Sequence, residues 1–229
     1  MYYPTLSGAL GSRKRTLMDT NHDFGFYAIL TDPVCGYEHL TRLVVQYGIA
    51  FVQLRMKDRP TEEVRDIAAM MREVTAGSRT RFIVNDFPEI AAAVGADGVH
   101  VGQNDMPIEQ ARRIVGPDAI IGMSTHNPAQ TARACAARPD YIGVGPVFPT
   151  PTKKIPDPPI GIEGMQTMLD IATVPAVVLG SITLENLPRI LTAGARNFSL
   201  VRPLNSTPDP EPVLREIVRI SGGSCEEAS

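Results

Sequence analysis

The chain has 229 residues, with 22 Lys and Arg against 25 Asp and Glu, and the resulting formal charge of −3 gives no general attraction to a polyanion. Nucleic acid is therefore not an expected partner. No apolar run reaches the roughly 18 residues that a membrane-spanning helix needs, so no membrane association is expected. The three cysteines, Cys35, Cys135 and Cys225, are far apart and odd in number. That pattern favours neither a disulfide framework nor a metal site, and it is typical of the reducing cytoplasm.

The two ends of the chain differ in composition from its centre. Residues 1–24 include a basic run at 13–15 without the apolar stretch of a signal peptide, and we interpret them as an N-terminal extension. Residues 221–229 are small and polar, so they bury too little surface to offset their ordering entropy, and we predict a flexible tail. Residues 25–220 then form one catalytic domain of about the size of a single α/β barrel.

Within that domain, short apolar runs of β type alternate with longer segments of helical periodicity. Thr61, which precedes two glutamates, and Pro88, Pro107 and Pro128 mark helix starts. The alternation predicts an α/β fold, a single (β/α)8 TIM barrel closed by short links. The alternative, an open doubly wound sheet, lacks support because neither GxGxxG after the first strand nor GxxxxGK[ST] is present. The expected strands are 26–30, 51–54, 81–84, 98–100, 120–123, 141–144, 176–179 and 197–200.

Functional groups follow seven of the eight expected strands. The carboxyl ends of barrel strands build the active face of such enzymes, so these positions are candidates for chemistry. The connection 145–162 is long and rich in proline, as lids and binding loops are. In chain order the candidates are Gln53, Arg55, Lys57, Asn85, Asp86, His100, Gln103, Asp105, Ser124, Thr125, His126, Thr150, Thr152, Lys153, Lys154, Gly180, Ser181, Val201 and Arg202.

Two acidic residues suggest a metal site. Asp86 and Asp105 follow adjacent strands, so their carboxylates can converge on one Mg²⁺ shared with a diphosphate. Helix capping or a loop position is the alternative for both aspartates. Arg55, Lys57 and Lys153 are read either as solvated surface charges or, given their shared placement, as an anion clamp.

Smaller groups at the same face leave alternatives open. The Gly180–Ser181 turn fits the phosphate site that such barrels form after strands seven and eight, and a tight turn would equally require Gly180. Ser124 either donates to a phosphate or caps the next helix. His126 is a candidate acid or base or a structural histidine, and His100 is interpreted as a packing histidine with satisfied hydrogen bonds.

Taken in order, five stretches resemble the thiamine phosphate synthase family. They are Gln53-Leu-Arg-Met-Lys57, Asn85-Asp86, Gly95 to Asp105 (GADGVHVGQND), Ile121 to His126 (IGMSTH) and Gly145 to Lys153 (GPVFPTPTK). The similarity runs from about residue 26 to 210 and implies a barrel of the phosphate-binding type. It also implies a transferase that condenses 4-amino-5-hydroxymethyl-2-methylpyrimidine diphosphate with hydroxyethylthiazole phosphate, giving thiamine phosphate and pyrophosphate.

The resemblance also implies roles for individual residues. The metal Mg²⁺ would be held by Asp86 and Asp105. Arg55, Lys57, Lys153 and Ser124 would be the catalytic residues. The pyrimidine diphosphate would bind through Gln53, Leu54, Arg55, Met56, Lys57, Asn85, Ser124 and Lys153. The thiazole phosphate would bind through Thr150, Pro151, Thr152, Gly180, Ser181, Val201 and Arg202.

The sequence departs from the family at the second phosphate site. Ser181 stands where the family pattern has a second glycine, and Arg202 stands where it has a serine. Two other functions therefore stay open: a thiazole tautomerase that uses His126, and a non-catalytic barrel that binds a thiamine precursor. Small phosphorylated molecules are the expected partners, and the sequence leaves a homo-oligomer open.

Overall fold

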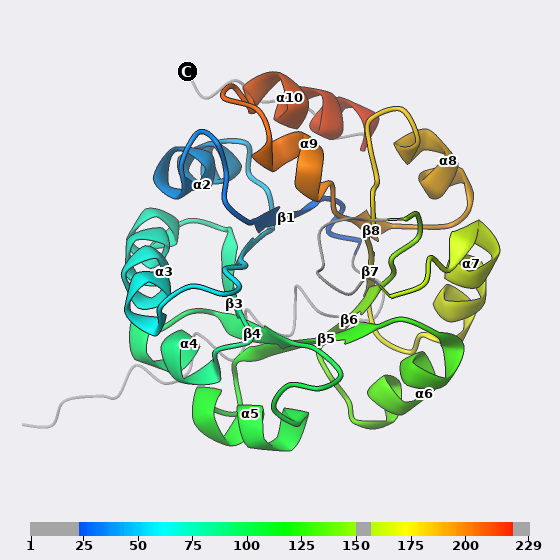
Figure 1. Ribbon diagram of the computed structural model, residues 1–229, viewed down its shortest axis with the longest axis horizontal. Coiled ribbons are helices and arrows are strands. Elements are labelled where there is room, and N and C mark those ends of the chain that lie inside the picture. The colour runs from blue at the N-terminus through cyan, green and yellow to red at the C-terminus, as the bar shows by residue number, and fades with distance from the viewer. Residues whose placement is uncertain (1–22, 150–156, 222–229) are drawn as a thin grey trace, which may run out of the picture.

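The strands form one closed, parallel ring. The computed structural model, which describes residues 23–149 and 157–221, contains an eight-stranded sheet in the order β1 to β8 (Figure 1). The ring closes where Phe26 forms a parallel bridge to Phe198 and the Phe198 amide donates to the Gly25 carbonyl oxygen at 3.0 Å. The predicted (β/α)8 barrel is therefore confirmed, and the open sheet is excluded. The strands are β1 (Tyr27–Leu30), β2 (Phe51–Leu54), β3 (Arg81–Asn85), β4 (Gly98–Val101), β5 (Ile120–Thr125), β6 (Tyr141–Val144), β7 (Ala176–Val178) and β8 (Asn197–Phe198).

The strand boundaries lie within two residues of those expected from the sequence. The largest differences are in β5, which runs on to Thr125, and in β8, which ends at Phe198. Strand β8 is short because Leu200 already lies at the N-cap of the following helix, and β7 ends before the sharp turn at Gly180. The apolar composition of a strand does not reveal where its pairing stops.

Helices connect the strands and cover the outside of the ring (Figure 1). Thr61, Pro88 and Pro128 are first residues of helices, as predicted, and Pro107 is the N-cap before a helix that starts one residue later. The five-residue helix α9 was not located from the sequence, because so short a segment carries little periodicity. The helices are α2 (Tyr37–Gln46), α3 (Thr61–Thr75), α4 (Pro88–Val94), α5 (Ile108–Val115), α6 (Pro128–Ala136), α7 (Gly161–Ile171), α8 (Leu187–Thr192), α9 (Val201–Asn205) and α10 (Glu211–Ile220).

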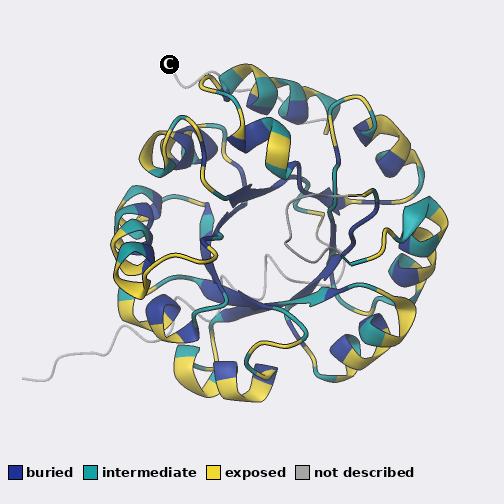
Figure 2. Ribbon diagram, in the orientation of Figure 1, coloured by how far each residue is buried: buried dark blue, intermediate teal, exposed yellow. Residues whose placement is uncertain are grey.

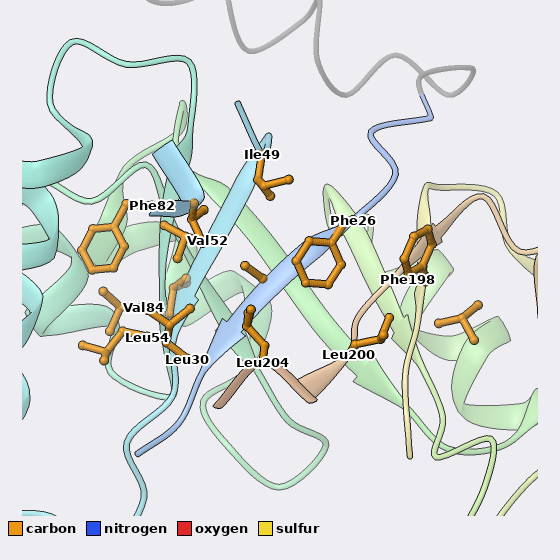
Figure 3. Packing of buried hydrophobic residues seen from close by; sticks show 14 of the residues in the cluster. Phe26, Leu30, Ile49, Val52, Leu54, Phe82, Val84, Phe198, Leu200 and Leu204 are labelled. Atoms are coloured by element: carbon orange, nitrogen blue, oxygen red, sulfur yellow. The ribbon is translucent and has the colours of Figure 1, made fainter. Parts of the chain in front are cut away.

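Alternate strand residues divide the core into two layers. In β1, Ala28 and Leu30 belong to the large cluster between strands and helices, whereas Tyr27 and Ile29 belong to a smaller cluster inside the ring. Figure 2 shows the strands buried and the outer helix faces exposed, and Figure 3 shows the packing of the outer layer. Full burial of each aliphatic side chain contributes about 1.5–3 kcal/mol. The outer layer thus fixes the ring, while the inner layer forms the floor of whatever lies above it.

The predicted N-terminal extension and C-terminal tail lie mostly outside the described residues, which exclude residues 1–22 and 222–229. Phe24, which the sequence assigns to the extension, packs on Phe51 with ring centroids 4.7 Å apart, and its amide donates to Asn197 Oδ1 at 2.8 Å.

Cys35 and Cys135 are free thiols. Across the described ranges, no helix combines the length and the apolar character needed to cross a membrane.

Candidate active site

A pocket opens over the ring at the carboxyl ends of the strands, where a barrel places its chemistry. It collects residues from separate βα units, so the barrel topology, rather than proximity in sequence, assembles it. Among the residues that the sequence proposed, the pocket is lined by Gln53, Arg55, Asn85, His100, Ser124, Thr125, His126, Gly180, Ser181, Val201 and Arg202.

Three residues of the expected diphosphate stretch, Leu54, Met56 and Lys57, do not line this pocket. Leu54 and Met56 are buried in the outer apolar layer, with exposed fractions of 1% and 3%. Gln53 and Arg55 face the pocket because they alternate with these two residues along the extended chain. The side chains of Leu54 and Met56 therefore stabilise the barrel, and the backbone is the only part of them left near the site.

Arg55 is a largely desolvated cation at the pocket wall. Its amide is held by the Leu30 carbonyl oxygen at 2.9 Å. Burial lowers the pKa of the Arg55 guanidinium, while the nearby carboxylates of Asp86 and Asp32 raise it. An arginine remains charged under these conditions, and no hydrogen bond joins the Arg55 guanidinium to another residue in the described ranges, so this largely desolvated group is suited to a phosphate ligand.

Beside the pocket lies a charged cluster of Lys57, Asp86 and Asp105. Lys57 Nζ contacts Asp86 Oδ2 at 2.7 Å, and the Asp105 Oδ2 accepts the Gly102 amide at 2.7 Å. Burial raises the pKa of the Asp86 carboxyl, the neighbouring Lys57 lowers it, and the neighbouring Asp105 carboxyl raises it. Asp105 thus lies close enough to Asp86 to affect the protonation of its carboxyl.

The cluster fits the donor set that Mg²⁺ prefers. The two neighbouring carboxylates repel one another, and a divalent cation between their oxygens would relieve that repulsion. In the described ranges, no group of three or more His, Cys, Asp or Glu could hold a metal. A cation at Asp86 and Asp105 would therefore depend on phosphate oxygens and water for its other ligands, as Mg²⁺ commonly does.

A continuous hydrogen-bonded chain runs through the interior of the ring to Ser124. Gln53 Nε2 donates to Tyr27 Oη at 3.1 Å, and Tyr27 Oη lies 2.7 Å from Tyr141 Oη. His100 Nδ1 lies 3.0 Å from Tyr141 Oη, and His100 Nε2 lies 2.9 Å from Ser124 Oγ. His100 thus has satisfied hydrogen bonds, as expected, but it also borders the pocket.

The groups in this chain are kept neutral by their surroundings. Burial lowers the pKa of His100 to about 4, with Asp105 raising it and the nearby cations lowering it. Burial also raises the pKa of Tyr27 and Tyr141 well above the usual value, although the Gln53 amide donor lowers both. Sequence reasoning missed the two tyrosines because each sits in an apolar strand; their hydroxyls, which need partners when buried, were the available signal.

The opposite side of the pocket contains the two departures from the family pattern. Ser181 adopts a left-handed backbone with φ 48°, and its Oγ donates to the Pro149 carbonyl oxygen at 2.7 Å. Any side chain at Gly180 would overlap the backbone of Pro146, so glycine is required there. Arg202, in the first turn of α9, is exposed and lines the pocket next to Ser181.

His126 occupies the wall between the two sides. Its Nδ1 lies 2.6 Å from the Gly145 carbonyl oxygen, which can only accept, so Nδ1 carries a proton. Its Nε2 lies 3.5 Å from Asp157 Oδ2. The remaining predicted residues, Thr150, Pro151, Thr152, Lys153 and Lys154, lie outside the described ranges.

Comparison with known proteins places the chain in a family. Residues 26–204 match the family model TMP-TENI, described as thiamine monophosphate synthase. A thiamine-phosphate synthase from Dictyoglomus turgidum is 34% identical over 92% of this chain and 96% of its own length. One from Gloeobacter violaceus is 40% identical over 80% of this chain, which spans only 53% of that relative. A solved thiamine phosphate pyrophosphorylase from Pyrococcus furiosus is 30% identical and superposes with a TM-score of 0.78 over 87% of this chain and 96% of its own. The chain therefore belongs to the thiamine monophosphate synthase family, a family of transferase enzymes.

Proposed function

We propose that this chain is a thiamine-phosphate synthase that joins 4-amino-5-hydroxymethyl-2-methylpyrimidine diphosphate to hydroxyethylthiazole phosphate and releases pyrophosphate. The observation that carries the proposal is that Arg55, Asn85 and Ser124 all line the pocket, beside the cluster of Lys57, Asp86 and Asp105. This arrangement suits a ligand with several negative charges.

The reaction breaks the bond between the pyrimidine methylene carbon and the diphosphate oxygen. The electron pair leaves with pyrophosphate, and the ring nitrogen of the thiazole supplies the pair for the new carbon–nitrogen bond. No residue of the chain acts as nucleophile in this scheme. The main requirement is stabilisation of charge on the leaving diphosphate, and a cation held by Asp86 and Asp105 would neutralise part of it.

The chain's own residues have distinct roles in this proposal. Arg55 and Lys57 bind the diphosphate by charge-assisted hydrogen bonds, and Lys153 joins them from the connection after β6. Ser124 donates to a diphosphate oxygen, while Gln53 and Asn85 orient the pyrimidine. The residues assigned to the thiazole phosphate are Thr150, Pro151, Thr152, Gly180, Ser181, Val201 and Arg202.

The departures at Ser181 and Arg202 are compatible with an anionic acceptor. The left-handed backbone of Ser181 is the conformation that a glycine would take, so its amide remains available. Arg202 adds a guanidinium beside it, which can contact a phosphate through two nitrogens. We further propose a cytoplasmic location and a homo-oligomer, whose size light scattering would measure.

A thiazole tautomerase is the second candidate, because His126 lies in the pocket wall and its Nδ1 is fixed by Gly145. Such an isomerase has no use for paired carboxylates or for a diphosphate clamp. The cluster of Lys57, Asp86 and Asp105 therefore favours the synthase over this candidate.

The test is formation of thiamine phosphate by the purified chain from the two phosphorylated substrates with Mg²⁺. We expect product that disappears with a chelator and returns with added Mg²⁺. The Lys153→Ala variant should lose turnover while keeping the thermal unfolding of the parent chain. Binding of the pyrimidine diphosphate without any product would instead support the binding barrel.

A further inference from the structure

Three residues in one row across strands β4, β5 and β6 create an unusual contact inside the ring. His100 pairs in register with Gly122, and Gly122 pairs with Tyr141. A side chain at Gly122 would overlap the Tyr141 hydroxyl and the His100 ring. The glycine therefore opens the space in which Tyr141 Oη and His100 Nδ1 meet at 3.0 Å across the intervening strand.

The hydrogen-bonded chain through this contact has one direction. Its first member, the Gln53 amide nitrogen, can only donate, so the Tyr27 oxygen accepts. The Tyr27 hydroxyl proton then points to the Tyr141 oxygen at 2.7 Å. Tyr141 in turn has its proton left for His100 Nδ1. Among the described residues, no other hydrogen-bond acceptor meets either hydroxyl, and reversal would leave a buried proton without an acceptor.

From this order we infer that Tyr141 and His100 are positioning residues, which fix His100 as the Nε2–H tautomer so that Ser124 Oγ accepts from it and turns its own hydroxyl proton into the pocket. The inference rests on the proposed function, because the anionic diphosphate is what the outward proton would meet. In the opposite tautomer the Ser124 proton would be used by His100, and Ser124 would offer the ligand only lone pairs.

The surroundings hold the other end of Ser124 in place. Gln103 Nε2 donates to the Ser124 carbonyl oxygen at 2.6 Å, so the backbone of this residue is anchored independently of its side chain. His100 is buried, with an exposed fraction of 8%, and because its Nδ1 accepts the Tyr141 proton, the ring proton lies on Nε2, next to Ser124 Oγ. The Ser124 hydroxyl is thus oriented by the Tyr141 hydroxyl through His100, and the same chain of hydrogen bonds continues to Tyr27 and the Gln53 amide.

The first test is the tautomer of His100 in the wild-type chain. Two-bond nitrogen–proton correlation spectra of protein labelled with ¹⁵N-histidine identify which ring nitrogen carries the proton. The His100 signals are those missing from the His100→Asn variant, out of four histidines in the chain. We expect a protonated Nε2 and an unprotonated Nδ1. A protonated Nδ1 would overturn the inference, whether or not the chain turns over substrate.

The second test measures binding of inorganic pyrophosphate with Mg²⁺ to four proteins: wild type, Tyr141→Phe, Ser124→Ala and the double variant. Ser124→Ala should weaken binding about tenfold, as loss of a hydrogen bond to a charged group does, and Tyr141→Phe roughly threefold to tenfold. In the Ser124→Ala background, Tyr141→Phe should change the affinity less than about twofold, because the two residues act through one hydroxyl.

A matched control separates this role from packing. Tyr27→Phe removes the same atom from an equally buried ring but leaves Tyr141 able to donate to His100, so its effect on pyrophosphate affinity should be smaller than that of Tyr141→Phe. Losses that add in the double variant, or equal losses from both tyrosine variants, would show a structural role and overturn the inference.

Discussion

The two rims of the barrel use charged residues in opposite ways. At the bottom rim, where strands begin, Asp97 Oδ2 accepts the Phe82 amide at 2.9 Å, and the two oxygens of Asp97 also contact Arg72 and Arg81. At the opposite rim, where the strands end and which we call the mouth, Arg55 lines an open pocket and the carboxyls of Asp86 and Asp105 are neighbours. The charged groups at the bottom pair with one another and stabilise the fold, whereas those at the mouth can still bind a ligand.

The bottom arrangement occurs twice. Asp140 Oδ2 accepts the Ile121 amide and contacts Arg112, both at 2.8 Å, and it precedes β6 just as Asp97 precedes β4. In each case an aspartate before one strand accepts the amide of the second residue of the strand before it. The repeat indicates a device for fixing strand register, since the aspartate joins backbone and guanidinium at one point.

Backbone strain is also distributed unequally. Turns at the bottom take left-handed conformations with glycine, as at Gly48 (φ 63°) and Gly95 (φ 67°). At the mouth, Asp86 takes φ 65° and Ser181 takes φ 48°, each at a cost of roughly 1 kcal/mol. Of the five described non-glycine residues with such angles, four follow strands at the mouth. Side chains have been kept there in spite of the strain, which points to their function.

The largest expected effect comes from replacing one arginine on each rim with alanine and comparing the two variants. Arg55→Ala should lower kcat/KM by about 10²–10³-fold, since it removes a preorganised donor from the leaving group, and should change the free energy of unfolding by less than about 1 kcal/mol. Arg81→Ala should leave kcat/KM within about twofold and lower stability by about 1 kcal/mol. Steady-state kinetics and urea titration measure both. Activity lost through Arg81 would erase the distinction between the rims.

Removing the bottom aspartate should affect stability alone. Asp97→Asn leaves an oxygen for the Phe82 amide but deprives Arg72 and Arg81 of their counter-charge. We expect the free energy of unfolding to fall by about 2 kcal/mol, because partly buried cations lose their partner. Urea titration measures the loss, and the synthase assay should be unchanged. Unaltered stability would show that the ion pairs contribute nothing to the fold.

At the mouth, replacing an aspartate with asparagine should affect the activity and leave the stability unchanged. Asp86→Asn should raise the Mg²⁺ concentration needed for half-maximal turnover by about tenfold or more, as one of two carboxylate ligands is lost. Stability should not fall, because burial and Asp105 already disfavour the charged Asp86 and asparagine tolerates its left-handed backbone. Asp97→Asn serves as the control, and an unchanged Mg²⁺ titration for Asp86→Asn would contradict the metal assignment.

The sequence predicted the mouth better than it predicted the bottom or the interior. Arg55, Asn85 and Ser124 were found because polar residues directly after apolar strands are visible in one dimension. Tyr27 and Tyr141 were not found, because strands buried on both faces give no sign of which residues face the ring interior. Their partnership depends on register across several strands, which only the folded ring defines.

The alternation of side chains along a strand is a further signal in the sequence, since neighbouring residues point to opposite faces of the sheet. Once Gln53 and Arg55 are placed in the pocket, the pleat puts Leu54 and Met56 on the other side, where the structure has them. The aspartates of the bottom rim offered no comparable signal, since an aspartate before a strand reads as an ordinary turn residue. Pairing of Asp97 with two arginines comes from helix and strand positions that are distant in the sequence.

The smallest expected effect tests the strained residue of the acceptor side. Ser181→Gly restores the glycine of the family pattern and relieves the left-handed strain by roughly 1 kcal/mol, but it also removes the hydrogen bond from Ser181 Oγ to Pro149, a loss of about 1 kcal/mol. The two effects nearly cancel, so unfolding should change by less than about 0.5 kcal/mol. Because the backbone amide keeps its place, the KM for the thiazole phosphate should change less than about threefold, which is under 1 kcal/mol. A much larger fall in KM would mean that the serine side chain obstructs the acceptor and that this side of the mouth is still adapted to another ligand.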